Sequence, residues 1–249
     1  MSANFNRVLR CFRDDMSTPG YQAKVQTIAD SVQLLAKVGL AVRQDFARNW
    51  ENAHVLLELD KLVAGGAASV LDFGGGNSPL CYTLAQAGLD VTVLDVDNTV
   101  AADVARGAAA LGLEERLHGA VNANGSDWPV PDGAFDLALS VSVFEGILRS
   151  RRPHYWSEMR RVLAPGGSLL MTFDYGLGGR LVGDPPVSPT EVETDILDAS
   201  GMALIGGEFE VPAFDDVVGP PVKAVVPTVD GFGYRVAQYS FGAVHLRRD

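Results

Sequence analysis

The sequence predicts an α/β fold with a doubly wound, mostly parallel sheet and helices on both faces. From Ser69 onward, short apolar stretches suited to strands alternate with stretches of helical periodicity. This alternation is typical of strand–helix–strand units with right-handed crossovers. A glycine-rich turn, Gly74-Gly75-Gly76, directly follows the first of these strands. In doubly wound sheets, ligands bind in the crevice beside such a turn.

Hydrophobic periodicity, together with residues that start or stop helices, predicts the helices and strands of the first two thirds of the chain. Residues 1–63 are expected to be helical, with one helix starting at Thr18-Pro19 and stopping at Gly39, and a second over about 49–63. Ser78 and Pro79 are an N-cap and a first helical residue for the helix after the glycine turn. We expect strands over about 69–73, 90–94, 117–121, 135–140 and 168–173. We expect helices over about 79–87, 98–111 and 155–163, and a short one near 145–148.

In the last third of the chain, the predicted helices and strands are separated by longer stretches that contain glycine and proline. Residues 175–189 are rich in glycine and proline and are expected to form a loop. Ser188-Pro189-Thr190-Glu191 is a capping box that should start a helix running to about residue 200. Residues 203–211 and 238–246 are expected to be strands. The apolar, proline-containing stretch between them, 212–235, is interpreted as an insertion over the active-site edge.

Length and composition limit the classes of protein. The chain of 249 residues suits one sizeable core. Its net charge of −11 argues against nucleic-acid partners, because a phosphate backbone repels such a surface. No apolar run reaches the roughly 18 residues of a membrane helix. The two cysteines, Cys11 and Cys81, and the lack of a signal-peptide pattern predict a cytoplasmic protein. The four histidines have no metal-ligand spacing, so no metal is expected.

The glycine turn leaves two cofactor classes open. Gly74 and Gly76 match a dinucleotide fingerprint, but Pro79 occupies its third glycine position. Asp95 ends the next predicted strand about twenty residues on, where an acid can bind both hydroxyls of a ribose. This spacing fits a site for NAD or for S-adenosylmethionine (SAM).

Three segments resemble the Rossmann-like (class I) SAM-dependent methyltransferases. Asp72-x-Gly74-x-Gly76 is similar to the first motif of that family, residues 124–140 to the segment that leads into its fourth strand, and 163–170 to the turn into its fifth. The matches occur in order and together cover about 69–173. The resemblance implies a seven-stranded sheet ending in an antiparallel hairpin, and SAM as cofactor. It also implies one domain, in which a helical cap (1–66) and substrate-side loops (175–249) flank a SAM-binding core (67–174).

The resemblance assigns roles to residues that match the family motifs. Asp72 would orient the methionine end of SAM, Asp95 would hold the ribose, and Val96 would lie against the adenine. Asn124 stands where the family often has an acid that reaches the adenine amino group. Ser140 would line the site through its carbonyl. The complete set of implied cofactor-binding residues is Asp72, Gly74, Gly75, Gly76, Asp95, Val96, Asn124, Gly125 and Ser140.

The acceptor side is less specified. Many relatives have Glu-His after the fourth strand, whereas Glu145-Gly146 keeps only the acid. The candidates for catalytic groups at the correct edge are Glu145, His154, Asp174 and Tyr175. Arg48, Trp50 and His54, on the predicted second helix, are candidates for a lid or substrate wall.

The motifs of base-methylating enzymes are missing from the fourth strand, which ends in Ser140-Val-Ser-Val. A small-molecule acceptor with an oxygen or nitrogen nucleophile is therefore expected, and the chain could form a homodimer. Two alternatives stay open. One is a SAM-fold protein that binds without catalysis or transfers an aminopropyl group, and the other, disfavoured by Pro79 and by 163–170, is an NAD-dependent oxidoreductase.

Overall fold

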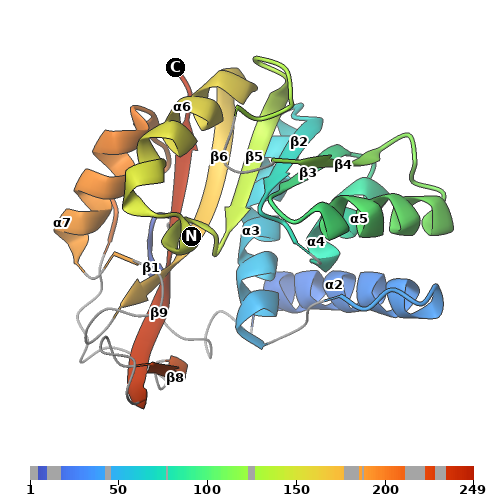
Figure 1. Cartoon of the computed structure of the whole chain (residues 1–249), viewed down its shortest axis with the longest axis horizontal. Helices are drawn as coiled ribbons and strands as arrows, with labels where there is room; N and C mark the ends of the chain where they lie inside the picture. The colour runs from blue at the N-terminus through green and yellow to red at the C-terminus, as the bar shows by residue number, and fades with distance from the viewer. Residues whose placement is uncertain are drawn as a thin grey trace.

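The computed structural model describes residues 5–9, 18–42, 46–76, 78–122, 127–176, 185–186, 188–210, 222–227 and 234–249. Within these residues the chain forms a mixed sheet with helices on both faces (Figure 1). The order of seven strands across the sheet is β1-β9-β6-β5-β2-β3-β4. This arrangement confirms the predicted α/β class and its doubly wound, mostly parallel sheet.

Five neighbouring strands are parallel. They are β2 (Ser69–Phe73), β3 (Asp90–Asp95), β4 (Leu117–Val121), β5 (Phe135–Val141) and β6 (Leu163–Gly176). The order in which strands are added changes side at β2, because β3 pairs with one edge of β2 and β5 pairs with the other. The crevice between these two strands opens at their carboxyl ends, where the glycine turn lies. The predicted strands agree with these five to within one residue, except that β6 is longer at both ends.

The far side of the sheet differs from prediction. Strand β9 (Tyr234–Arg247) is antiparallel to β6, as expected for the last strand of the sheet. Its other edge pairs in turn with three short strands: β8 (Val222–Pro227), β1 (Arg7–Leu9) and β7 (Ala203–Leu204).

Two predictions in this region were therefore wrong. Residues 7–9 form a strand and not a helix, because β9 offers them a partner more than 230 residues along the chain. The strand expected over 203–211 is only two residues long, since Gly206 and Gly207 take positive φ angles of 94° and 133°. In the stretch 212–235, residues 222–227 form β8 and residues 234–235 begin β9. Residues 212–221 and 228–233 lie outside the described residues, so the interpretation of this stretch as an insertion over the active-site edge stays a prediction.

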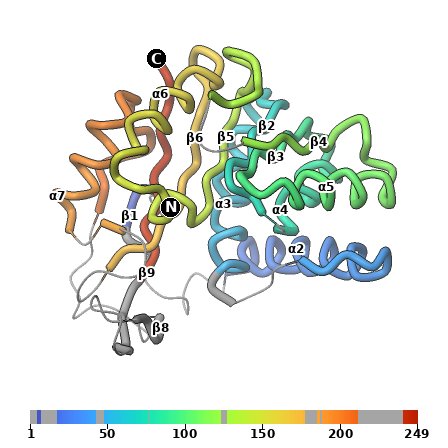
Figure 2. Tube along the Cα trace, in the orientation of Figure 1, coloured from blue at the N-terminus to red at the C-terminus, as the bar shows by residue number. Residues whose placement is uncertain are grey.

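Helices cover both faces (Figure 2). On one face lie α2 (Pro19–Lys37), α3 (Phe46–Ala64), α4 (Pro79–Gln86) and α5 (Asn98–Leu111). On the other lie α6 (Arg152–Val162), α7 (Pro189–Val192) and η4 (Glu193–Asp198). The predicted capping residues are confirmed, because Thr18, Ser78 and Ser188 each accept a hydrogen bond from the first turn of their helix. Two short 3₁₀ turns, η2 (Phe144–Gly146) and η3 (Arg149–Arg151), connect β5 to α6.

Successive side chains of each buried strand point to opposite faces of the sheet, so each strand contributes to both hydrophobic cores. Val70, Leu137 and Leu170 pack with α2–α5, whereas Leu71, Ala138 and Leu169 pack with α6 and the helix after Ser188.

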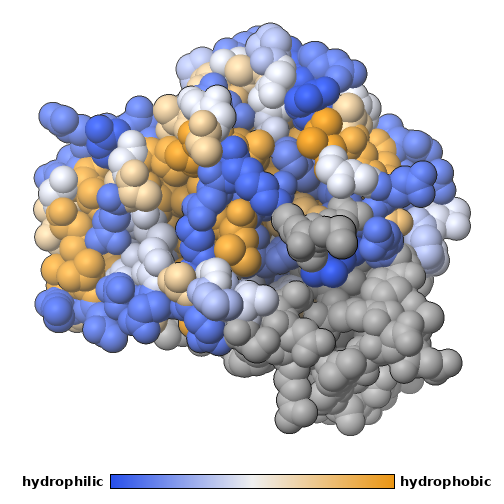
Figure 3. All heavy atoms as spheres, turned by 180° about the vertical axis from the view of Figure 1, so that it is seen from behind, coloured by the Kyte–Doolittle hydropathy of each residue, from blue (hydrophilic) through white to orange (hydrophobic). Residues whose placement is uncertain are grey.

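Hydrophilic and hydrophobic side chains are interspersed on the surface that is seen from behind (Figure 3). Among the described residues, no helix is both long and apolar enough to cross a membrane.

Candidate ligand-binding site

The glycine turn brings main chain and acids together at the carboxyl end of β2. Gly74 and Gly76 have φ angles of 67° and 54°, a conformation that side-chain-bearing residues rarely adopt. A Cβ atom on Gly74 would lie 2.6 Å from Cγ2 of Val143. On Gly75, it would collide with the carboxylate of Asp72. Only glycine therefore fits at these two positions, because Val143 and Asp72 occupy the space that a Cβ atom would need.

Asp72 is buried without a full set of partners. Its side chain is 1% exposed, and Oδ2 has no hydrogen-bond partner in the structure. Burial, with a smaller contribution from the charge of Asp95, raises the pKa of Asp72 to about 7. A buried carboxyl group with an unused oxygen is costly unless a ligand binds it. A cationic group would compensate for both the burial and the missing hydrogen bond.

Asp95, at the end of β3, is held in a defined orientation. Its Oδ2 accepts from the backbone N–H of Gly76 at 3.0 Å, and its Oδ1 accepts from that of Asp97 at 2.9 Å. Each carboxylate oxygen keeps a further lone pair for a ligand hydroxyl. The carboxylate can therefore accept two hydrogen bonds from a diol.

A cavity of about 610 Å³ lies beside Asp95. Val96 and Asn122 border it on the β3 and β4 side, and Val143 and Ile147 line it from the turns after β5. Phe73, Trp128 and Tyr155 supply aromatic surface, with the rings of Phe73 and Trp128 stacked at 4.5 Å between centroids. Apolar walls with a diol-binding acid at one side suit a flat heterocycle joined to a sugar.

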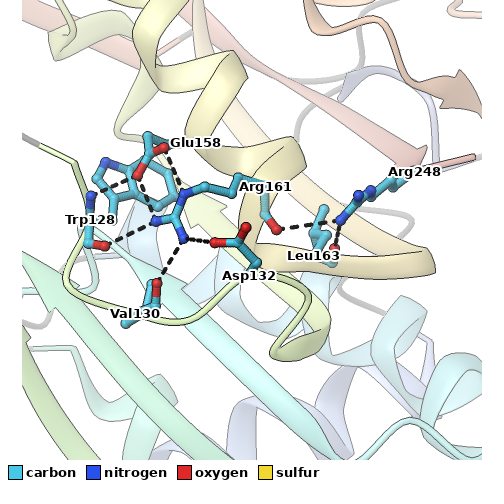
Figure 4. A network of polar contacts seen from close by, with 7 residues as sticks. All are labelled: Trp128, Val130, Asp132, Glu158, Arg161, Leu163 and Arg248. Carbon is cyan, nitrogen blue, oxygen red and sulfur yellow. Dashed lines mark hydrogen bonds and ion pairs between the residues drawn. The ribbon is translucent and has the colours of Figure 1, made fainter.

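A polar network fixes Trp128 at the wall of this cavity (Figure 4). Arg161 of α6 forms a bidentate pair with Glu158, at 2.8 and 2.7 Å, and donates to the carbonyl oxygens of Trp128 and Val130. Glu158 in turn accepts from the backbone N–H of Trp128 at 2.7 Å. The pKa of Glu158 is lowered, mainly by its hydrogen bond with Arg161. The segment after β4 is thus tied to α6.

A second cavity, of about 210 Å³, lies on the other side of the glycine turn. Asp72 and the glycines face Arg48 and Asn52, which project from the helix α3. Asn52 is fully buried, and neither its amide nitrogen nor its amide oxygen has a hydrogen-bond partner in the structure. Acid, amide and guanidinium groups thus surround a space the size of a small amino acid. This combination suits a zwitterion, whose ammonium group would face Asp72 and whose carboxylate would face Arg48 and Asn52.

The two cavities meet at Gly74 and Ser142, which line both. Ser142 has a φ of 49°, the one positive value at a non-glycine position among the described residues. Its hydroxyl donates to Oε1 of Glu51 at 2.6 Å, and that same oxygen accepts from Thr172 at 2.7 Å. Arg48 is 3.2 Å from Oε2 of Glu51 and also donates to the carbonyl of Val141. Glu51 therefore locks α3 onto the ends of β5 and β6.

The residues predicted as catalytic candidates on the acceptor side do not lie together in one site. Glu145, in η2, is buried, and its pKa is raised to about 8 by burial and then by Asp174 and Glu51. His154 instead lines the larger cavity. Tyr175 is buried on the face opposite Asp174, and burial raises its pKa.

The other sequence-based candidates are placed as follows. Ser140 is fully buried and lines neither cavity, whereas Val141 and Ser142 do. Asn124 and Gly125 lie outside the described residues, so their predicted contact stays a prediction. Of the helix residues proposed as a lid, Arg48 lines the smaller cavity. Trp50 and His54 stack on each other in the core, at 5.7 Å between ring centroids, and are packing residues.

Sequence reasoning missed Glu51, Asn52 and Asn122. Asn122 directly follows β4 and lines the larger cavity. Glu51 and Asn52 share one face of α3 with Arg48, at positions i+3 and i+4, and this spacing is the signal that could have joined them to it. Among the described residues, no cluster of three or more His, Cys, Asp or Glu side chains could hold a metal ion.

Comparison with known proteins finds similarity to methyltransferases. Residues 71–171, which include the glycine turn and β3–β5, match the methyltransferase domain family. An uncharacterized methyltransferase of Mycolicibacterium gilvum (strain PYR-GCK) is 32% identical over 110 residues. The aligned region covers 44% of this chain and 40% of that relative, so the chain spans less than half of the length of the curated relative that it matches.

Solved structures share the fold over nearly the whole chain. The [4+2]-cyclase SpnF is similar with a TM-score of 0.55 and 20% identity, over 92% of this chain and 96% of SpnF. The 1,6-didemethyltoxoflavin-N1-methyltransferase of Burkholderia thailandensis, with bound 1,6-didemethyltoxoflavin and S-adenosylhomocysteine, gives a TM-score of 0.53 and 16% identity. That similarity covers 96% of this chain and 93% of the enzyme. At these identities the likeness concerns the fold.

Proposed function

We propose that this chain, which belongs to the class I SAM-dependent methyltransferase family through residues 71–171, transfers a methyl group from SAM to an oxygen or nitrogen of a small molecule. The observation that carries the proposal is the pair of cavities joined at Gly74 and Ser142. One is bordered by a diol-binding acid and the other by buried polar groups that lack partners. SAM has a ribose at one end, an amino acid at the other and a sulfonium between them.

The residues present fit this cofactor. Asp95 would accept from the ribose hydroxyls, and Val96 and Val143, which line the larger cavity, would lie against the adenine. Asp72 would hold the ammonium group, while Arg48 and Asn52 would hold the carboxylate. Without Cβ atoms at Gly74 and Gly75, the main chain of the glycine turn could approach the cofactor closely. The buried Asn52 and Asp72 atoms gain the hydrogen bonds that they lack.

When bound, SAM supplies an activated methyl group on a good leaving group. The protein then has two tasks, which are to align the acceptor with the methyl group and to accept the acceptor's proton. Glu145, which is buried in η2, and Asp174, whose charge raises the pKa of Glu145, are our candidates for proton acceptance. His154 and Tyr175 remain secondary candidates on the other face. In this proposal residues 1–66 form a cap, residues 67–174 bind SAM and residues 175–249 supply the substrate side.

The proposal also covers the partners, the cellular location and the oligomeric state of the protein. The net charge of −11 supports small-molecule partners over nucleic acids. Cys81 is buried and free, as is usual in a reducing compartment, and this supports a cytoplasmic location. The chain could act as a homodimer.

Titration calorimetry with SAM, S-adenosylhomocysteine and NADH tests the cofactor. We expect both sulfur compounds to bind and NADH not to bind, and tight NADH binding alone would overturn the assignment. A second candidate function keeps SAM binding without methyl transfer. It is favoured by Glu145-Gly146, which lacks the histidine common in relatives. Release of S-adenosylhomocysteine with a panel of acceptors separates the two functions.

A further inference from the structure

A serine, a histidine and a glutamate form a chain of polar contacts at the end of the sheet opposite the glycine turn. His245 of β9 places its Nε2 atom 3.0 Å from Oγ of Ser168 on β6, and its Nδ1 atom is 3.4 Å from Oε1 of Glu58 on α3. Ser168 pairs with Leu137 near the amino end of β5, whereas the glycine turn follows the carboxyl end of β2. This group of residues is therefore separate from the proposed SAM site.

The register of the sheet brings the three side chains to the face that α3 covers. His245 lies opposite Leu170 on β6, and Leu170 packs into the core shared with α2–α5. Ser168 is two residues from Leu170 and points to the same face, where it lies diagonally across from His245. Glu58 reaches the histidine from α3. Three elements that are distant in the sequence thus build one site.

The surroundings of these groups decide what each can do. His245 is 4% exposed, and its backbone N–H donates to Oδ1 of Asn6 at 2.7 Å. Burial opposes the ionisation of Glu58, but hydrogen bonds with His245 and Lys61 outweigh it and lower the pKa of Glu58 to about 2. A carboxylate beside Nδ1 favours the tautomer that carries its proton there, which leaves Nε2 to accept from the hydroxyl of Ser168. Nucleophile, base and orienting acid then follow one another as in a Ser-His-acid triad.

Ser168 borders a third cavity, of about 360 Å³. Lys61 and Leu62, near the end of α3, line this cavity together with residues 164–167, which precede Ser168 on β6. The ammonium group of Lys61 is paired with Glu58, and its side chain is 52% exposed, so it supplies positive charge at the cavity wall. A nucleophile, a base and a cation thus meet beside a space for a small ligand. This combination suits an acyl group whose carbonyl oxygen faces Lys61 as negative charge develops on it.

We propose that Ser168 and His245, positioned by Glu58, form a second reactive site, which hydrolyses small carboxylic esters through an acyl group carried on Ser168. The oxygen of Ser168 bonds to the carbonyl carbon while its proton passes to Nε2 of His245. The carbon–oxygen bond to the alcohol then breaks, and His245 gives the proton to the leaving oxygen. Water next adds to the acyl carbon and loses a proton to His245. The bond to Ser168 breaks, the proton returns to the serine oxygen and the carboxylic acid leaves.

Covalent labelling of the wild-type chain tests the nucleophile. The probe is diisopropyl fluorophosphate, in which an activated serine oxygen attacks phosphorus and displaces fluoride, and mass spectrometry of peptides locates the label. Release of p-nitrophenolate from p-nitrophenyl acetate measures hydrolysis. We expect the label on Ser168 and hydrolysis that Ser168→Ala abolishes, whereas Ser157→Ala, at an exposed serine of α6, should keep both. A wild-type protein that is not labelled at Ser168 would overturn the inference.

Variants of the other two groups test the triad. His245→Gln and Glu58→Gln should each slow the labelling of Ser168 about hundredfold or more, because a positioned general base contributes at least that much. Added imidazole should restore labelling in His245→Ala, which a purely structural role of the histidine would not produce. SAM affinity in the folded variants should stay unchanged, since the site lies at the opposite end of the sheet. Labelling at the wild-type rate in folded His245→Gln and Glu58→Gln proteins would refute the triad.

Discussion

Replacement of Asn52 by leucine should make the free protein more stable and the cofactor complex weaker. The side chain is fully buried on α3 and lines the smaller cavity, with neither polar atom partnered by the protein. Leucine has a similar size and shape and removes both polar atoms. A residue kept for folding alone would give the opposite result.

The expected size follows from the cavity. A buried, unsatisfied polar group costs about 1–3 kcal/mol. The cavity of about 210 Å³ has room for several water molecules, which satisfy part of the capacity of the amide. The net gain in the free energy of unfolding is therefore about 1 kcal/mol, or an increase in Tm of about 2–4 °C for a chain of this size. Loss of a hydrogen bond to the charged carboxylate of SAM should cost about 1.5–3 kcal/mol, roughly a tenfold to hundredfold weaker Kd.

The assay combines thermal unfolding of the free protein with calorimetric titration of SAM. Asn49→Leu is the matched control, because Asn49 lies on the same helix, also has a buried amide oxygen without a partner and does not line the cavity. It should leave the SAM affinity unchanged. An Asn52→Leu protein that is less stable than wild type and binds SAM normally would refute the reasoning.

Three further perturbations address the glycine turn and its acids. Gly74→Val should abolish SAM binding in a folded protein, because even a Cβ there would lie 2.6 Å from Val143; retained binding on titration would make the turn purely structural. Asp95→Ala should weaken SAM binding by about 1.5–3 kcal/mol through lost ribose contacts, and an unchanged Kd would remove Asp95 from the site. Burial raises the pKa of Asp72 from its ordinary value of 3.8 to about 7, so in the free protein this group lowers folding stability as the pH rises from about 4 to about 7, and the effect is nearly constant above that range. Since the ammonium of SAM needs the ionised form, affinity should rise about fivefold from pH 6 to pH 7, and calorimetry should show this rise vanish in Asp72→Asn.

The part of the fold that local signals encode was predictable. The bounds of β2 and β4 follow from short apolar runs, and α4 begins at Pro79 because Ser78 caps it. Strand β1 was missed because three residues carry little local signal, and β8 because it lies in a proline-containing stretch that was interpreted as an insertion. They become strands only through pairing with β9, which the sequence places far away.

The residues of the candidate site also fall into those that local sequence signals predicted and those that depend on tertiary packing. Asp72, Gly74 and Asp95 belong to a motif with fixed spacing, and the structure brings them together around the two cavities. Asn52 was missed because its importance depends on where α3 packs. Trp50, on the same helix, looked equally suited to a substrate wall, but it turns into the core against Phe241. Which face of a helix meets the sheet is a tertiary property that spacing alone leaves open.

The position of β9 between β6 and β1 has a consequence for synthesis on the ribosome. Residues 7–9 emerge first but pair with residues 241–243, and the backbone N–H of His245 donates to Asn6, 239 positions earlier. The nascent chain must therefore keep this segment unpaired, and the outer edge of β6 open, through most of translation. The five parallel strands that carry the glycine turn are complete by Gly176 and can assemble before β9 is made. The exposed edge of β6 can then receive β9, which in turn provides the edge for β1, β7 and β8.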